Sequence, residues 1–245
     1  MRSFLIALSA LLALVASPLH ALDGRQIMEK SDALTQPKSV RAAVLMLIEK
    51  GGRVVEKEFE LVGKKSGDNE RVLISFSRPT SIQLLTHTYK GRDDDQWLVL
   101  SSGKVKRIAL ADSDKPFVNS HFYYEDLKSR DIDDYGYTLL GDARAGGVDC
   151  YKVEAKARSK NVVYDKAVFY IDKTSFFAMR IDIYMKGELH KYLENHDIRK
   201  VNGILTPYRA VMHAADGKSK TDLRIKSVTY NVPIADSQLS KEALR

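Results

Sequence analysis

Apolar and polar residues alternate with a period of two along much of this chain, which is the pattern of a β-strand with one buried face. The clearest run is 177–186, in which Ile181 and Ile183 alternate with Arg180 and Asp182. Similar strand-like runs occupy residues 40–50, 53–64, 71–77 and 221–230. A hairpin is predicted from an apolar run at 97–100, a Ser-Ser-Gly turn at 101–103 and a basic strand at 104–110.

Short turn sequences separate these runs, among them Gly51-Gly52, Asn202-Gly203 and Asp216-Gly217. Some eleven or more successive strands with short connections predict an antiparallel meander. A single sheet of that length curls, because every strand twists in the same sense. We therefore predict a mainly β protein with a few α-helices, in which a curved antiparallel sheet forms a half-open barrel capped by helices. One domain is expected to cover residues 22–245.

Two segments are candidates to cover the apolar face of this sheet. Residues 22–34 have helical spacing of apolar residues, with Asp23 as a candidate N-cap and Pro37 just beyond the end. Residues 119–130 follow an aromatic stretch and form the second candidate cover.

The alternation also predicts which side chains line the concave face, where an apolar ligand would bind. Phe117 and Phe122 are expected to lie over its mouth as a lid, with residues 111–116 as the hinge. The predicted lipid-binding residues are Phe59, Leu61, Ile74, Phe76, Trp97, Phe117, Phe122, Met179, Ile181, Ile183, Leu223 and Ile225.

Residues 1–21 have the features of a secretory signal peptide. Arg2 supplies the positive charge, an apolar run follows from Phe4 to Ala16, and Leu19-His20-Ala21 is a cleavage sequence. The apolar run is too short to span a bilayer. Export to the periplasm is therefore expected. The single cysteine, Cys150, excludes an internal disulfide, and we interpret it as a buried apolar residue.

Composition narrows the range of partners. The formal net charge of +7 favours anionic partners and is compatible with peripheral contact at a membrane surface. The charges are interspersed rather than gathered into a tract, so nucleic acid is not an expected partner.

Candidate catalytic chemistry is sparse. Glu194 could bind a metal with His190 and His196 on one strand face, but polar residues with this spacing are commonplace on solvated faces. Aspartate clusters at 93–95 and 131–134 lack the spacing of a calcium loop. The sequence contains neither a Gly-x-Ser-x-Gly motif nor a glycine-rich phosphate loop. We expect no enzyme activity, no cofactor and no metal.

Several motifs, in a fixed order, carry a resemblance to a known family. They are Phe76-Ser77-Arg78-Pro79, Asp94-Asp95-Gln96-Trp97, Lys106-Arg107-Ile108, Tyr124-Glu125-Asp126-Leu127, Asp133-Asp134-Tyr135-Gly136, Cys150-Tyr151-Lys152-Val153 and Asn202-Gly203-Ile204-Leu205-Thr206-Pro207. In this order the chain resembles the LolA-like outer-membrane lipoprotein-sorting family. It departs from the family at His121, where aspartate is usual, and at Val99, where tyrosine is usual.

The resemblance implies a periplasmic carrier that shelters the acyl chains of a lipoprotein or another envelope lipid, loaded by an inner-membrane transporter. Two alternatives stay open. One is an accessory module of an envelope efflux or lipid-export complex. The other is an exported enzyme that acts on a lipid or glycan. An enzyme would bring a carboxylate or histidine pair together in the cleft, whereas a carrier would have a dry wall.

The first prediction concerns the amino terminus of the exported protein. Cleavage after Ala21 would leave Leu22 as the first residue. Edman sequencing of the protein recovered from the periplasm is expected to begin at Leu22. An intact Met1 would contradict the signal-peptide interpretation.

Overall fold

A single antiparallel sheet of thirteen strands forms the body of the protein in this computed structural model, which describes residues 22–128, 130–160 and 162–244. The strands are β1 (Ser39–Lys50), β2 (Arg53–Ser66), β3 (Asn69–Arg78), β4 (Ile82–Thr88), β5 (Asp95–Val99), β6 (Val105–Arg107), β7 (Tyr135–Ala145), β8 (Val148–Ala157), β9 (Lys166–Asp172), β10 (Ala178–Met185), β11 (Glu188–Val201), β12 (Ile204–Ala214) and β13 (Lys220–Tyr230). The predicted signal peptide lies outside the described residues.

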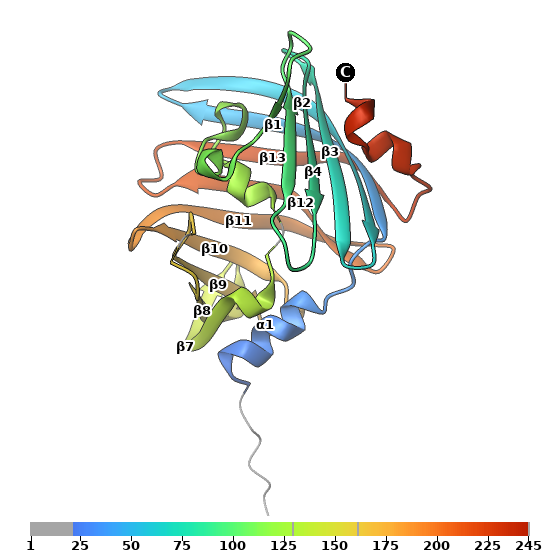
Figure 1. The fold of residues 1–245 in the computed structure, drawn as a ribbon. Coiled ribbons are helices and arrows are strands. Elements are labelled where there is room, and N and C mark those ends of the chain that lie inside the picture. Colours follow the sequence, from blue (N-terminus) through green and yellow to red (C-terminus); the bar gives the residue numbers. More distant parts are fainter. Residues whose placement is uncertain (1–21, 129, 161, 245) are drawn as a thin grey trace, which may run out of the picture.

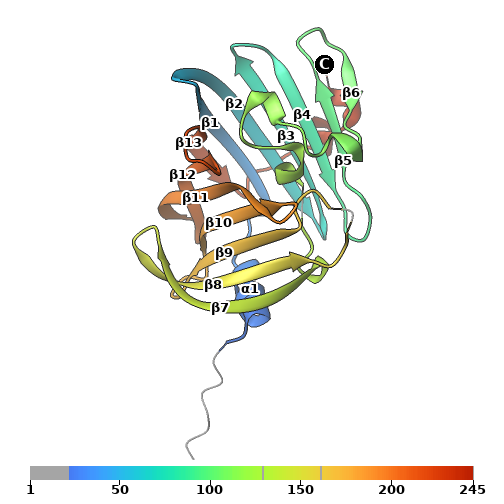
Figure 2. The same cartoon turned by 90° about the vertical axis from the view of Figure 1, so that its left-hand side faces the viewer.

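The strand order is β6-β5-β4-β3-β2-β1-β13-β12-β11-β10-β9-β8-β7. Every neighbouring pair is a chain-consecutive hairpin except β1 with β13, which joins the two ends of the chain at the middle of the sheet. The sheet curves so that β1 to β6 and β7 to β12 form two arms facing each other, and its edges β6 and β7 do not pair (Figures 1 and 2). The predicted fold, a curved half-open antiparallel sheet, is confirmed.

The only α-helix among the described residues is α1 (Gly24–Asp32), which covers β7 and β8. Asp23 is its N-cap as predicted, since its carboxylate accepts a hydrogen bond from Gln26 N at 2.8 Å. Gly24 lets the helix approach closely, because a Cβ there would lie 2.7 Å from Leu139 N of β7. None of the described helices has the length and apolar composition needed to cross a bilayer.

The apolar residues of the two arms share one face of the sheet, here called the inner face. Register places Phe59 opposite Phe76, and Leu61 opposite Ile74, in the first arm. In the second arm, Ile181 and Ile183 lie opposite Phe169 and Ala167. The buried Asp182 and its neighbour Arg180 are on the opposite, outer face, as the alternation predicted.

Residues 108–128, here called the bridging segment, lie across the inner face between the two arms (Figure 2). This segment contains short 3-10 turns at η1 (Leu110–Asp112), η2 (Phe117–Asn119) and η3 (Tyr124–Leu127) rather than an α-helix. In the first arm, Phe117 packs on Phe76 with ring centroids 5.7 Å apart. Phe122 packs instead with Ile183 and Met212 of the second arm.

A buried ion pair fixes the bridging segment to the second arm. Lys191 Nζ of β11 lies 2.5 Å from Asp126 Oδ2, and the two side chains are only 3% and 6% exposed. The ammonium also donates to the carbonyl of His121 at 3.2 Å, and it lies over the ring of Tyr123. Burial lowers the pKa of Lys191, and the Asp126 carboxylate opposes that shift. Both charges therefore depend on each other for compensation in the interior.

The second prediction follows from this burial. Lys191→Met leaves the Asp126 carboxylate buried without a counter-ion, so the free energy of unfolding is expected to fall by about 3–5 kcal/mol. Lys173→Met is the matched control, because its ion pair with Asp142 is more exposed and exposed pairs contribute little to stability. Urea denaturation of both variants measures the difference. Equal losses of stability would show that the buried pair does not hold the segment.

Candidate functional site

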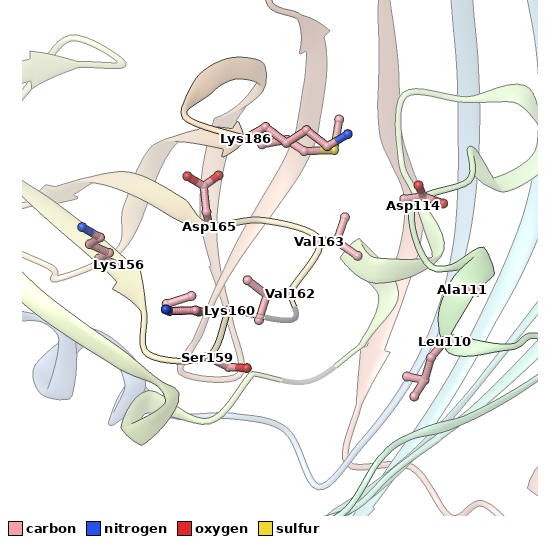
Figure 3. A pocket seen from close by; sticks show the side chains of 12 residues that line it. Leu110, Ala111, Asp114, Lys156, Ser159, Lys160, Val162, Val163, Asp165 and Lys186 are labelled. Atoms are coloured by element: carbon pink, nitrogen blue, oxygen red, sulfur yellow. The ribbon is translucent and has the colours of Figure 1, made fainter.

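A cavity lies between the bridging segment and the second arm, at the opening of the curved sheet (Figure 3). Its volume of about 610 Å³ falls within the range of small-molecule and lipid sites. It is open to solvent along one side. Three chain segments far apart in sequence build it: η1, the connection from β8 to β9, and the end of β10 with its turn.

The wall of this cavity is apolar. Leu110 and Ala111 of η1 stand across from Val162 and Val163 of the β8–β9 connection, and Met185 of β10 completes the wall. Leu110 is 64% exposed and Val162 is 38% exposed. Val163 and Met185 also pack against Ile183, so the wall continues into the apolar core of the second arm.

Charged side chains stand around the rim of the same cavity. Lys156 belongs to β8, Lys160 to the β8–β9 connection and Lys186 to the turn after β10. Asp165 also lines the cavity, and its Oδ2 accepts a hydrogen bond from Gly187 N at 3.1 Å. Asp114 stands at the far side, where Lys115 lies 3.4 Å from its carboxylate. The cavity therefore combines an apolar wall with a mostly cationic rim.

The sequence did not indicate this cavity. Of the twelve predicted lipid-binding residues, none is in direct contact with it as a lining residue. Ile181, Ile183 and Phe122 come nearest, since they pack in the same cluster as Val163 and Met185. A signal was present in the exposed aliphatic residues Leu110 and Val162, but nothing in the sequence shows that they face each other.

In the first arm, most of the predicted residues lie together but beneath the bridging segment. Phe59, Ile74, Phe76 and Phe117 are buried in one cluster, with Leu61, Leu223 and Ile225 packed against it. The interpretation of Phe117 as a lid is therefore wrong in its placement. It is 2% exposed and contacts both Phe76 and Tyr124, so it is a core residue. In this arm the bridging segment covers the described apolar residues of the inner face.

Trp97 lies on the outer face, contrary to the prediction. Its partners across the sheet are Leu85 and Arg107, whereas Leu98 occupies the inner face opposite Leu84. The carboxyl-terminal residues lie over the outer face here, with the carbonyl of Leu239 2.8 Å from His87 Nε2. The ammonium of Lys241 lies 6.0 Å from the Trp97 ring centroid. Trp97 is thus separated from the inner face by the sheet.

Met179 belongs to β10 of the second arm but lies outside the apolar clusters of the inner face. It stands at an irregularity in the pairing of β10 with β9, between Ala178 and Arg180. Its side chain is buried against Gly146 in the turn between β7 and β8. There it lines a smaller cavity of about 320 Å³ together with Asn195 and His196.

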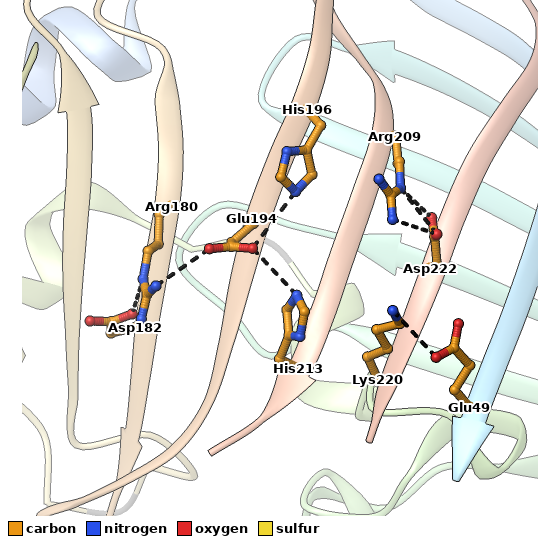
Figure 4. Close-up of polar contacts among 9 residues, drawn as sticks. All are labelled: Glu49, Arg180, Asp182, Glu194, His196, Arg209, His213, Lys220 and Asp222. Carbon is orange, nitrogen blue, oxygen red and sulfur yellow. Dashed lines mark hydrogen bonds and ion pairs between the residues drawn. The ribbon is translucent and has the colours of Figure 1, made fainter. Parts of the chain in front are cut away.

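The outer face of β9 to β13 carries a network of charges (Figure 4). Glu194 accepts from Arg180 Nη1 at 3.4 Å, while His213 Nε2 and His196 Nε2 lie 3.4 and 3.7 Å from its other oxygen. His190 is not in this group and contacts the ring of Tyr123. The described residues contain no group of three or more His, Cys, Asp or Glu side chains able to hold a metal ion.

Asp222 is the most buried member of this network, with its side chain 1% exposed. Burial alone would raise its pKa, but hydrogen bonds from Arg224 and Arg209 outweigh it and leave the pKa lowered. The carboxylate is thus held ionised as a structural anchor between β12 and β13. Cys150 is fully buried, as predicted, and burial raises the pKa of its thiol.

This fold defines a class: an unclosed, curved sheet with its inner face covered by a helix and loops, as in LolA-like proteins. A family model whose description reads "uncharacterized protein" matches residues 68–245. The chain belongs to that family. The resemblance to LolA-like lipoprotein-sorting proteins is confirmed. No curated protein matches the chain.

Solved structures agree with this assignment. A DUF1329 family protein from Desulfovibrio piger is 27% identical, with a TM-score of 0.86 over 91% of this chain and 98% of its own. A domain from Vibrio parahaemolyticus, assigned as an outer membrane lipoprotein-sorting protein, is 25% identical, with a TM-score of 0.84 over 90% and 97%. A LolA superfamily protein from Nitrosomonas europaea is 19% identical, with a TM-score of 0.69 over 91% and 100%, and shares the fold.

The third prediction uses the position of Trp97. Because the sheet separates its indole from the inner face, a ligand that enters the cavity should leave its emission maximum unchanged. Fluorescence titration with a long-chain fatty acid, with binding followed independently by calorimetry, measures this. A blue shift at saturation would mean that the ligand reaches the outer face or displaces the carboxyl-terminal residues.

Proposed function

We propose that this protein is a periplasmic carrier that shelters the acyl chains of a lipoprotein or another envelope lipid in the cavity beside the bridging segment. The observation that carries the proposal is the solvent-open cavity with an apolar wall of Leu110, Val162, Val163 and Met185. The LolA-like fold and the likeness to a lipoprotein-sorting domain support the same class of ligand.

Physical chemistry favours this use of the cavity. Each methylene transferred from water to an apolar wall contributes about 0.8 kcal/mol, so a partly sheltered chain binds without any catalytic group. Transfer of a lipid from a bilayer to the cavity gains little free energy, because the bilayer interior is as apolar as the cavity wall. A carrier of this kind would therefore be loaded by an inner-membrane transporter, which supplies the work.

The acyl chain would enter past Val163 and Met185 and continue toward Ile181, Ile183 and Phe122, which pack in the same cluster. The other predicted lipid-binding residues of the first arm lie under the bridging segment. They would contact a ligand only after that segment moved. The buried pair of Lys191 and Asp126 opposes such movement.

The alternatives have less support. An enzyme needs converging acid and base groups, whereas Asp114 and Asp165, the carboxylates of the described lining, stand on different sides of the cavity. An accessory module would bind its partner through an exposed apolar patch. Leu100 and Val105 of the β5–β6 hairpin are 38% and 42% exposed and are where such a partner segment would dock.

The fourth prediction tests the cavity wall. Leu110→Asp should weaken binding of a long-chain fatty acid by about tenfold, since losing contact with two methylenes costs about 1.6 kcal/mol. Val54→Asp is the matched control, because Val54 of β2 is similarly exposed, at 61% against 64%, but does not line the cavity. Isothermal titration calorimetry gives both affinities.

Native mass spectrometry of the protein from the periplasm is expected to detect a bound lipid, and less of it in Leu110→Asp. Thermal unfolding verifies that both variants fold, which is expected because both positions are exposed. Equal affinity of the two variants for the fatty acid would show that the ligand does not bind in this cavity. Absence of any bound lipid, together with no measurable fatty-acid affinity, would overturn the carrier proposal.

A further inference from the structure

The three lysines at the rim of the cavity are not neutralised by the protein. Lys156, Lys160 and Lys186 are exposed, and within the described ranges no carboxylate lies within 4 Å of their ammonium groups. Lys166, nearby in the sequence, does have a carboxylate partner, since it pairs with Glu154 at 3.7 Å. The rim thus presents free positive charge around an apolar wall.

The aspartates of the lining do not cancel this charge. Asp114 lies 3.4 Å from Lys115, which is not a lining residue. Asp165 accepts the backbone N–H of Gly187, and its other oxygen is enclosed by the protein, away from solvent. Asp165 is then the one lining carboxylate left against three lysines in the part of the chain that the structure describes.

The lysines border the apolar wall, so a ligand with an apolar chain and an anionic end could contact both. Lys156, Lys160 and Asp165 border one side of the cavity and Lys186 borders another, with Val162 and Val163 between these groups and η1 (Figure 3). An acyl chain along Val163 and Met185 would leave its polar end at the lysines. A phosphate there would accept charge-assisted hydrogen bonds, which are stronger than neutral ones.

We propose that the ligand of this cavity is a lipid with a phosphate headgroup, whose phosphate is bound by Lys156, Lys160 and Lys186. This inference rests on the proposed function, because it assigns the headgroup of the lipid whose chains the cavity shelters. It predicts a preference for an anionic phospholipid over an acylglycerol with the same chains and no charge.

The experiment compares two monomeric probes of equal chain length, dioctanoyl phosphatidylglycerol and dioctanoylglycerol, by calorimetry on the mature protein. The wild-type protein is expected to bind the phospholipid at least tenfold more tightly, as charge-assisted contacts to one phosphate imply. That preference should shrink at high salt, because the rim is exposed to solvent.

A triple variant, Lys156→Gln with Lys160→Gln and Lys186→Gln, should lose the preference and keep its affinity for dioctanoylglycerol. The control carries Lys104→Gln, Lys200→Gln and Lys218→Gln, which remove the same charge from exposed lysines outside the cavity. It should bind both probes as the wild-type protein does.

The remaining outcomes separate the two proposals. Equal wild-type affinity for both probes would overturn the headgroup assignment and leave the carrier proposal standing, whereas binding of neither would overturn both. If glycerol 3-phosphate binds as tightly as the phospholipid, the site recognises a phosphate group alone and the lipid assignment is wrong. If the protein binds phosphatidylglycerol vesicles but not the monomeric probe, the lysines contact a membrane surface and do not bind a single lipid in the cavity.

Discussion

A curved sheet with one apolar face must cover that face, and this requirement governs the rest of the molecule. Thirteen strands that twist in one sense bring two apolar arms toward each other without closing the ladder. The bridging segment fills the space between them, with Phe117 packed on the first arm and Phe122 on the second. The cavity is the part of the opening that the segment does not fill, and its wall is a continuation of the same apolar core.

Electrostatics divides the two faces of the sheet. The outer face keeps its charges in networks such as Asp222 with Arg209 and Arg224, where each cation compensates a carboxylate. On the inner face, Lys191 and Asp126 form a pair that is held away from water. At the rim of the cavity, by contrast, lysines stand without partners among the described residues.

The sequence predicts the sheet well because alternation is a local property. The faces of β10 were assigned correctly from Ile181, Ile183 and Arg180, and Asp23 was correctly identified as a helix cap. Prediction from alternation fails where both faces of a strand are buried. The run around Trp97 has no alternation, and its face is decided by register with Leu85 and by the distant carboxyl-terminal residues.

The cavity could not be predicted for a related reason. Leu110 and Val162 are 52 positions apart in sequence, and only the path of the bridging segment brings them to one opening. Phe117 shows the same limit of sequence-based prediction for a single side chain. An aromatic residue after a loop suits both a lid and a core plug, and only its contacts with Phe76 and Tyr124 decide between them.

The pairing of β1 with β13 has a consequence for how the chain folds. Each arm is a meander of consecutive hairpins, whose contacts are local and form quickly. The arms can be joined only when the last strand returns to the first, which closes a loop of nearly the whole chain at a large cost in chain entropy. The pairing of β1 with β13 is therefore expected to form after the hairpins within each arm. Until β13 pairs with β1, the apolar inner faces of the two half-sheets share no common interior and stay open to contact with other chains.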